Sequence, residues 1–265
     1  MIKIILTLAA FLISIISLAQ VSENREVTDF SKLRVSNSID VFYTISDKKS
    51  VKVETDDNEK LKLIKTEVEN GTLKLFVNTK DYKEKQNKKG KKRSNISFIN
   101  GVEFQVLKIT ISGPNLEAIK ASSSADVKIE NANTSTSSDI TVSSSGSISG
   151  NFHCTNLVLD ASSSGEFVGK IDSISVVIES SSSSDVNLSG KASKISVKAS
   201  SSSDCNLKDL MVEEAIIGAS SSADVSIKVS KVIEAKASSS ASILYFGNPL
   251  TVKKEENSSG SVKSK

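Results

Sequence analysis

A serine-rich block recurs along the second half of the chain at a nearly constant interval, and this repeat constrains the fold more than any other feature. Its first copy is the stretch IKASSSADVKI at residues 119–129, and near-copies follow to the end of the sequence. The residue before the serines, taken as the anchor of each unit, is in turn Ala121, Val142, Ala161, Ser180, Ala199, Ala219, Ala237 and Glu256. Successive anchors lie 18 to 21 residues apart. A near-constant period over so many units indicates a solenoid.

Two columns of the repeat are apolar in nearly every unit. Two residues before the anchor stand Ile119, Ile140, Leu159, Ile178, Val197, Ile217 and Ala235; six residues after it stand Val127, Ile148, Phe167, Val186, Cys205, Val225, Ile243 and Val262. Polar residues alternate with them, which predicts strands with one buried face. A disordered serine linker has no such columns. We therefore predict an all-β fold, a single-stranded right-handed parallel β-helix with three short strands and three turns in each coil of about 19 residues.

The serines predict a structural ladder at one corner of the coils. One unbroken column consists of Ser123, Ser144, Ser163, Ser182, Ser201, Ser221 and Ser239. Alternation from Ile119 and Ala121 predicts that this column points inward, where each hydroxyl needs a hydrogen-bond partner. The residue after each serine block is small, for example Ala125, Gly146 or Ser184, which indicates a crowded corner with positive φ in the glycine units.

The next column is largely acidic, and Asp185, Asp204 and Asp224 occupy it in three consecutive units. Stacked carboxylates repel one another, so one interpretation is a cation such as Ca²⁺ between them. The alternative is that each aspartate accepts a hydrogen bond from the amides of its own turn. Serine stands in this column in three other units, which favours the second interpretation, and we predict no obligatory cofactor.

The chain before the repeats also has residue patterns that predict β-strands. Residues 30–58 predict two or three strands, and Asn70-Gly71 predicts the turn of a hairpin. Asp40-Val41 matches Asp126-Val127 of the first repeat. We predict that residues 30–111 form a β-rich cap on the stack, that residues 112–265 form the β-helix repeats, and that residues 20–265 together make a single domain.

The first 19 residues predict an export signal. Lys3 precedes an apolar run, and Ser17 and Ala19 supply small residues at the positions before a cleavage site. The alternative is a retained membrane anchor, because the run approaches a spanning length. Cleavage after Ala19 is favoured because no basic stop-transfer cluster follows. We predict a mature protein in the periplasm, at the outer-membrane surface or outside the cell.

A basic segment separates the two regions. Residues 80–93 contain eight basic and two acidic residues, so their local charge is +6, whereas the whole chain carries +3. A solvated loop is the simplest interpretation; attraction to an anionic envelope surface is the functional one. The candidate binding residues are Lys83, Lys85, Lys88, Lys89, Lys91, Lys92 and Arg93. With only Tyr82 beside them there is no stacking platform for nucleic acid.

Residues that carry catalysis or hold metals are scarce. His153 is the only histidine, and Cys154 and Cys205 are the only cysteines. They fall in different columns of the repeat, so we expect two buried thiols without a bridge and no zinc site. Coils of nearly equal length also leave no room for the long loops that wall the active-site groove of β-helix enzymes.

Three stretches carry a family resemblance: ITISGPNLEAIKASSSADV, the repeated ASSSADV-type units, and the ending ASILYFGNPLTVKKEENSSGSVKS. In them the chain resembles the putative auto-transporter adhesin, head GIN domain family. Its members usually have glycine in the serine corner, where this sequence has Ser123, Ser163 or Ser201. The resemblance implies an exported bacterial cell-envelope protein with a β-helix-like fold and no catalytic residues. We predict a non-catalytic, adhesin-like module that binds glycan, envelope polymer or protein. The alternatives are a structural rod and, less favoured, a polysaccharide-active enzyme.

Overall fold

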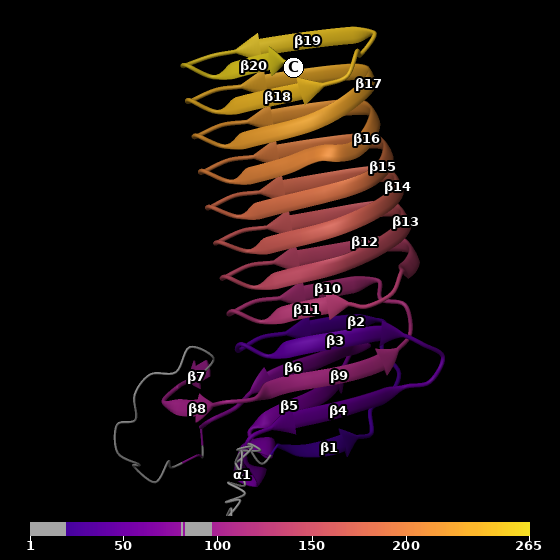
Figure 1. The fold of residues 1–265 in the computed structure, drawn as a ribbon, viewed down its shortest axis with the longest axis vertical. Coiled ribbons are helices and arrows are strands. Elements are labelled where there is room, and N and C mark those ends of the chain that lie inside the picture. Colours follow the sequence, from indigo (N-terminus) through magenta and orange to yellow (C-terminus); the bar gives the residue numbers. More distant parts are fainter. Residues whose placement is uncertain (1–19, 81, 83–96) are drawn as a thin grey trace, which may run out of the picture.

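The chain folds into a parallel β-solenoid, which confirms the predicted fold class. A computed structural model describes residues 20–80, 82 and 97–265. Flattened coils stack along one axis, with the C-terminal end at the top of Figure 1 and the N-terminal strands at the bottom. The predicted signal segment lies outside the described residues. Within the described part of the chain, no helix has the length and apolar character needed to cross a membrane.

Each central coil contains one long, bent strand and one short corner. This differs from the predicted three short strands, because the backbone ladder skips only one position at the bend and then continues in register. The strands of the repeats are β10 (Ala118–Ala121), β11 (Asp126–Ile129), β12 (Asn133–Val142), β13 (Ser147–Ala161), β14 (Glu166–Ser180), β15 (Asp185–Ala199), β16 (Asp204–Ala219), β17 (Asp224–Ala237), β18 (Ser242–Phe246), β19 (Thr251–Glu256) and β20 (Ser261–Ser264).

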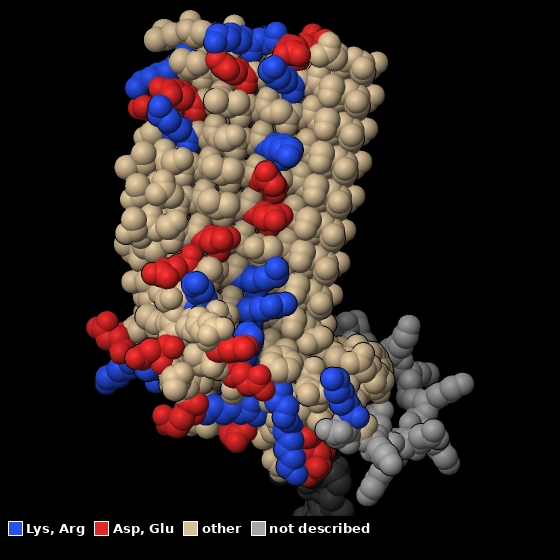
Figure 2. Space-filling model, turned by 180° about the vertical axis from the view of Figure 1, so that it is seen from behind, with Lys and Arg blue, Asp and Glu red and all other residues tan. Residues whose placement is uncertain are grey.

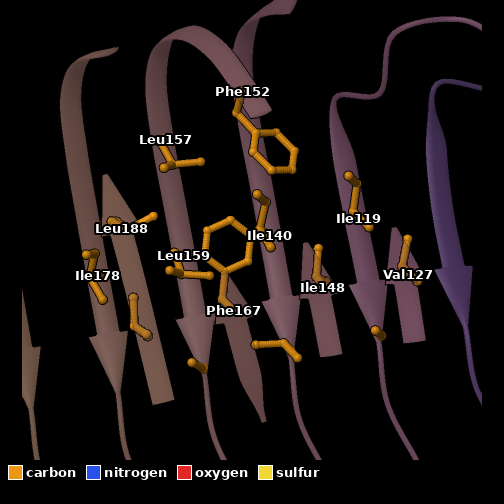
Figure 3. Close-up of a cluster of buried hydrophobic side chains, with 14 of the residues drawn as sticks. Ile119, Val127, Ile140, Ile148, Phe152, Leu157, Leu159, Phe167, Ile178 and Leu188 are labelled. Atoms are coloured by element: carbon orange, nitrogen blue, oxygen red, sulfur yellow. The ribbon is translucent and has the colours of Figure 1, made fainter. Parts of the chain in front are cut away.

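The core is built from the two predicted apolar columns. Ile119 pairs in register with Ile140, and the same column continues to Ala235. The second column runs in register from Val127 to Val262. Both columns are buried between the two faces of the stack (Figure 3). A one-residue slip of any strand would turn its apolar side chains to water, so the columns fix the register.

The serine corners bend through left-handed backbone. In nine corners two successive residues have φ between 47° and 64°, and in eight of them both residues are serine. Their amides continue the ladder: the N–H of Ser124 donates to the carbonyl oxygen of Ser144 at 3.0 Å, and equivalent bonds join the later corners. The prediction that the Ser123 column points inward is wrong. Because the left-handed residues turn the chain there, Ser123 and Ser124 are exposed, and the glycines of the corner do not have positive φ.

The residue after each serine pair points inward instead. A Cβ atom added to Gly165 would lie 2.6 Å from the carbonyl oxygen of Val142, so this column admits only small residues. Where it holds serine, the hydroxyl is satisfied: Ser184 Oγ donates to the carbonyl oxygen of Ala161 at 2.9 Å, and Ser203 Oγ to that of Ser180 at 3.0 Å. The buried, hydrogen-bonded serines therefore lie two positions later than predicted.

The N-terminal strands extend the same stack. Val35 pairs with Ala121 and Val41 with Val127, so the predicted match with the first repeat is confirmed. The elements are β1 (Val21–Arg25), β2 (Lys32–Val35), β3 (Asp40–Ile45), β4 (Ser50–Thr55), α1 (Asn58–Leu61), β5 (Ile64–Glu69), β6 (Thr72–Val77), β7 (Ser97–Ile99), β8 (Val102–Phe104) and β9 (Leu107–Gly113).

Below β2 and β3, the pairing changes from parallel to antiparallel. Strands β6 and β9 run parallel to β2 and β3, whereas β5, β4 and β1 add antiparallel pairs. The predicted hairpin turn is confirmed, since Asn70 and Gly71 have φ of 51° and 70°. The chain between Val77 and Leu107, which includes the basic segment, joins β6 to β9 where other coils have a four-residue corner. The capping role of this region and its boundaries remain predictions.

Candidate functional site

A groove runs along the solenoid where the long strands bend, on the side opposite the serine corners. Its volume is about 910 Å³, and it crosses β12 to β17 and ends at Gly247 and Asn248. A second hollow of about 470 Å³ continues it toward the N-terminal strands and shares Thr134 and Ser135 with it. We call the larger hollow the axial groove.

The floor of the axial groove is one in-register column of small or apolar residues. Its members are Cys154, Ser173, Ala192, Val212 and Val229, each paired with the next. Burial raises the pKa of the Cys154 thiol, so this group is neutral at neutral pH. Ser173 is buried, and its Oγ lies 3.1 Å from the carbonyl oxygen of Ser175 and 3.2 Å from that of Thr155. The floor therefore offers no free charge.

The walls of the axial groove expose large apolar side chains. Ile174 and Met211 both line the groove, and each is 59% exposed. The charged wall residues are mostly paired: Lys191 Nζ lies 3.1 Å from Asp172 Oδ2, and Lys231 Nζ lies 2.9 Å from Glu213 Oε2. Exposed apolar side chains in a concave surface are unfavourable in water and are typical of binding sites.

The bend that forms the groove has a local structural cause. Residues Thr155, Ile174 and Ser193 are skipped by the backbone ladder, so each strand changes its facing direction there. Gly190 has φ of 105°, and a Cβ atom on it would lie 2.1 Å from the carbonyl oxygen of Ile171. The register between β16 and β17 also shifts near Met211. Bulges of this kind redirect side chains next to functional sites.

The C-terminal end of the axial groove carries an unpaired cation. Lys228 lines the groove beside Gly247 and Asn248, and it forms no ion pair with any described residue. At the other end stand Thr134, Ser135 and His153. In the adjoining second hollow, Lys32 is accompanied by Glu117 and Asp139. The only net positive end of the described groove is therefore the Lys228 end.

The groove residues do not form a catalytic arrangement of the nucleophile–base type. His153 lies within β13 and lines the groove. Among the described residues no hydrogen bond joins His153 to a carboxylate or hydroxyl, and the Ser173 hydroxyl is directed at backbone carbonyl oxygens. Hydrogen-bonded contact between nucleophile and base is the geometric signature of such chemistry.

The predicted aspartate column is brought into register but not into a metal cluster. Asp185 pairs with Asp204, and Asp204 with Asp224, on the exposed face beside the serine corners. None of the three carboxylates accepts a hydrogen bond from a described residue, so the turn-amide interpretation is not seen. Partial burial first, and then the charges of Asp224 and Asp185, raise the pKa of Asp204. Within the described ranges no three metal-binding side chains converge. The cation ladder stays an untested interpretation.

The other candidate residues are those of the basic segment and of the serine corners. Lys83, Lys85, Lys88, Lys89, Lys91, Lys92 and Arg93 fall outside the described residues, so their binding function stays a prediction. The serine corners form an uncharged strip along one edge of the molecule, and charges of both signs follow the middle of the adjoining sheet (Figure 2). That sheet face offers no field of one sign that would select a charged ligand.

Sequence reasoning missed the axial groove. Its wall residues Ile174 and Met211 do carry a signal, because they are large apolar residues at positions where the alternation predicts outward, polar side chains. The depth of the groove depends on where each strand bends, and the apolar columns do not encode that point.

The chain matches a known protein family over most of its length. Residues 29–249 match the family model described as "Putative auto-transporter adhesin, head GIN domain". The chain belongs to this family. The expected resemblance is thereby confirmed, and membership in this adhesin-like family suggests an exported protein. A comparison with curated proteins gives no match.

Solved structures with the same fold come from Parabacteroides and Bacteroides species. One from Parabacteroides distasonis, described as a putative lipid binding protein, is 22% identical with a TM-score of 0.81, and the match covers 93% of this chain and 96% of that one. A putative adhesin from Parabacteroides merdae is 15% identical with a TM-score of 0.78, over 93% and 96% of the two chains. A putative adhesin from Bacteroides fragilis is 21% identical with a TM-score of 0.63, over 93% and 97%. At these identities the likeness supports the shared fold.

Proposed function

We propose that this GIN-domain protein is an exported, non-catalytic, adhesin-like module of the cell envelope, and that its ligand lies along the axial groove. The observation that carries the proposal is the continuous groove of about 910 Å³ with exposed Ile174 and Met211 in its walls. A purely structural rod gains nothing from such a groove, because exposed apolar walls lower solubility.

The absence of a hydrogen-bonded nucleophile–base pair among the described groove residues supports a binding function over catalysis. The similar solved structures are described as putative adhesins and as a putative lipid binding protein, which also agrees with a binding function. Within the groove, a ligand would contact hydroxyl groups at the Thr134 end and apolar side chains along β14 to β16. An extended amphipathic envelope molecule fits this sequence of surfaces.

The test uses an uncharged fluorescent dye, N-phenyl-1-naphthylamine, and a panel of envelope glycans and lipids that compete with it. Met211→Glu places a charge in the groove wall and should reduce dye binding at least tenfold. Ile216→Glu is the matched control, since Ile216 is 60% exposed on the same strand but does not line the groove. Equal loss in both variants, or no loss in either, would remove the groove as the ligand site. A native protein that binds neither the dye nor any panel member would favour the structural rod.

A further inference from the structure

The two ends of the axial groove differ in chemistry. This difference defines the ligand more narrowly than the class of extended amphipathic molecules. The floor is neutral throughout, and its apolar part lies toward the C-terminal end, where Ala192, Val212 and Val229 follow one another in register. Cys154 and Ser173 continue it toward the hydroxyl-lined end. From Cys154 to Val229 there are four coil spacings, or about 19 Å at about 4.8 Å each.

The walls make this floor suitable for a hydrocarbon chain. Ile174 and Met211 stand beside the floor in coils that contribute Ser173 and Val212 to it. An alkyl chain placed along the axis covers both side chains, and it also covers the small side chain of Ala192. A glycan would leave these apolar side chains exposed to water. It would also bring hydroxyl groups to a floor that offers few hydrogen-bond partners.

The charges at the two ends of the axial groove set the orientation of the ligand. Asp172 is neutralised by Lys191, and Glu213 by Lys231, so Lys228 is the cation of the described groove that has no carboxylate partner. Asn248 stands beside it as a potential hydrogen-bond donor. An ammonium group next to an amide is complementary to a carboxylate.

We infer that the axial groove binds a free long-chain fatty acid, with its carboxylate at Lys228 and Asn248 and its acyl chain along the floor from Val229 toward Cys154. This inference rests on the proposed function, because it assigns a ligand class to the same groove. The complex is non-covalent. The length of the floor matches a long-chain acyl group, and the single unpaired cation matches its single negative charge.

The test measures affinities of octanoate, laurate, palmitate and the uncharged hexadecanol, below their aggregation concentrations, by displacement of N-phenyl-1-naphthylamine. Affinity should rise with chain length by up to about fourfold per methylene group and level off beyond palmitate, where the floor ends. Palmitate should bind more tightly than hexadecanol by roughly two- to fivefold, the worth of an exposed ion pair.

Two variants separate the contribution of the ligand's carboxylate to affinity from that of its acyl chain. Lys228→Gln should abolish the preference for palmitate over hexadecanol and leave hexadecanol binding unchanged. Lys198→Gln, on the outward sheet face, is the matched control and should change neither. Ile174→Gln, which places an uncharged polar side chain in the groove wall away from Lys228, should weaken palmitate and hexadecanol alike.

Three results overturn the inference. If palmitate and hexadecanol bind equally in the native protein, the carboxylate site is wrong. If no acyl compound displaces the dye while an envelope glycan does, the ligand class is wrong, yet the groove keeps its proposed function. If the protein binds phosphatidylglycerol vesicles but not monomeric palmitate, the surface docks on membranes and does not hold a free fatty acid.

Discussion

The serine pair at each corner holds left-handed backbone with a residue type that does not favour it. A non-glycine residue in this conformation costs roughly 1–2 kcal/mol. The side chains of Ser201 and Ser202 are exposed, so they add no burial that could offset this cost. The cost is offset by the inter-coil hydrogen bonds of the Ser201 carbonyl oxygen and the Ser202 N–H and by packing elsewhere in the coil. The block is readable from the sequence as a repeat, but its backbone conformation is not, since three serines in a row also fit a strand or a loop.

Substitutions at Ser201 test this strain. Ser201→Val should destabilise the protein by about 1–2 kcal/mol, because a β-branched residue fits poorly at the φ of 54° found there. Ser201→Gly should be neutral or stabilising by up to about 1 kcal/mol, since glycine relieves the strain but adds freedom to the unfolded chain. Urea unfolding midpoints measure both. Ser196→Val on the exposed face of β15 serves as control and should be tolerated. A harmless Ser201→Val would show that the corner is not strained.

At the scale of the element, one glycine lets β15 approach the backbone of β14 closely just before the bend. Gly190 combines a left-handed φ with close approach to the backbone of β14. Gly190 could not be singled out from the sequence, because the solenoid repeat has no glycine in that column. The buried apolar columns of the same strand were predicted correctly, since they repeat in every coil and depend only on alternation.

Gly190→Ala should therefore destabilise the protein by roughly 2–4 kcal/mol, from backbone strain and from a clash with the Ile171 carbonyl oxygen. Gly218→Ala is the matched control: an added Cβ there meets nothing within 4 Å, so the unfolding midpoint should stay the same or rise slightly. Thermal and urea unfolding measure the difference. Comparable behaviour of the two variants would show that the close approach at Gly190 does not require glycine.

The stacked aspartates make stability depend on pH. The pKa of Asp204 is raised above its ordinary value of 3.8 by partial burial and by Asp224 and Asp185, with Lys208 opposing. The folded protein thus holds this proton more tightly than the unfolded chain does. The resulting stabilisation is complete below the unfolded pKa and is lost as the pH rises through the folded pKa.

Asp204→Asn should accordingly stabilise the protein at pH 7 by roughly 0.2–1 kcal/mol, the size of a cross-strand charge repulsion, and this gain should shrink toward pH 3.5. Urea unfolding in the presence of EDTA measures it without a bridging cation. Asp139→Asn, whose register partners are Ala118 and Val158, is the control and should show no such gain. A native protein that is more stable at pH 7 than Asp204→Asn in EDTA would contradict the repulsion. Stabilisation by added Ca²⁺ that is lost in the variant would instead support the cation ladder.

At the scale of the whole molecule, charge is divided between the basic segment and the rest of the chain. Replacing Lys83, Lys85, Lys88, Lys89, Lys91, Lys92 and Arg93 by glutamine should weaken binding to an anionic polysaccharide such as heparin and make it less dependent on salt. Dye binding in the axial groove should not change. Retention on the polysaccharide that is unaffected by the replacement would remove the segment as a binding site.

The stack, its period and its core columns were all predictable, because each follows from residues such as Ile119 and Val127 that recur at a fixed spacing. The axial groove was not, because it is a property of the assembled coils: Ile174 and Met211 come together only once the strands bend. For the same reason Lys228 was not recognisable as an unpaired cation until the partners of Lys191 and Lys231 were known.

The most direct test of the binding account is to locate a bound ligand. A photoreactive palmitate analogue, cross-linked to the full-length mature protein and mapped by mass spectrometry, should label Ile174, Met211 and their neighbours in the groove. Labelling should be suppressed by excess palmitate. The exposed apolar residues Val158 and Ile216 on the sheet face outside the groove provide the internal comparison. Competed labelling at those residues in place of the groove would contradict the assignment of the axial groove as the ligand site.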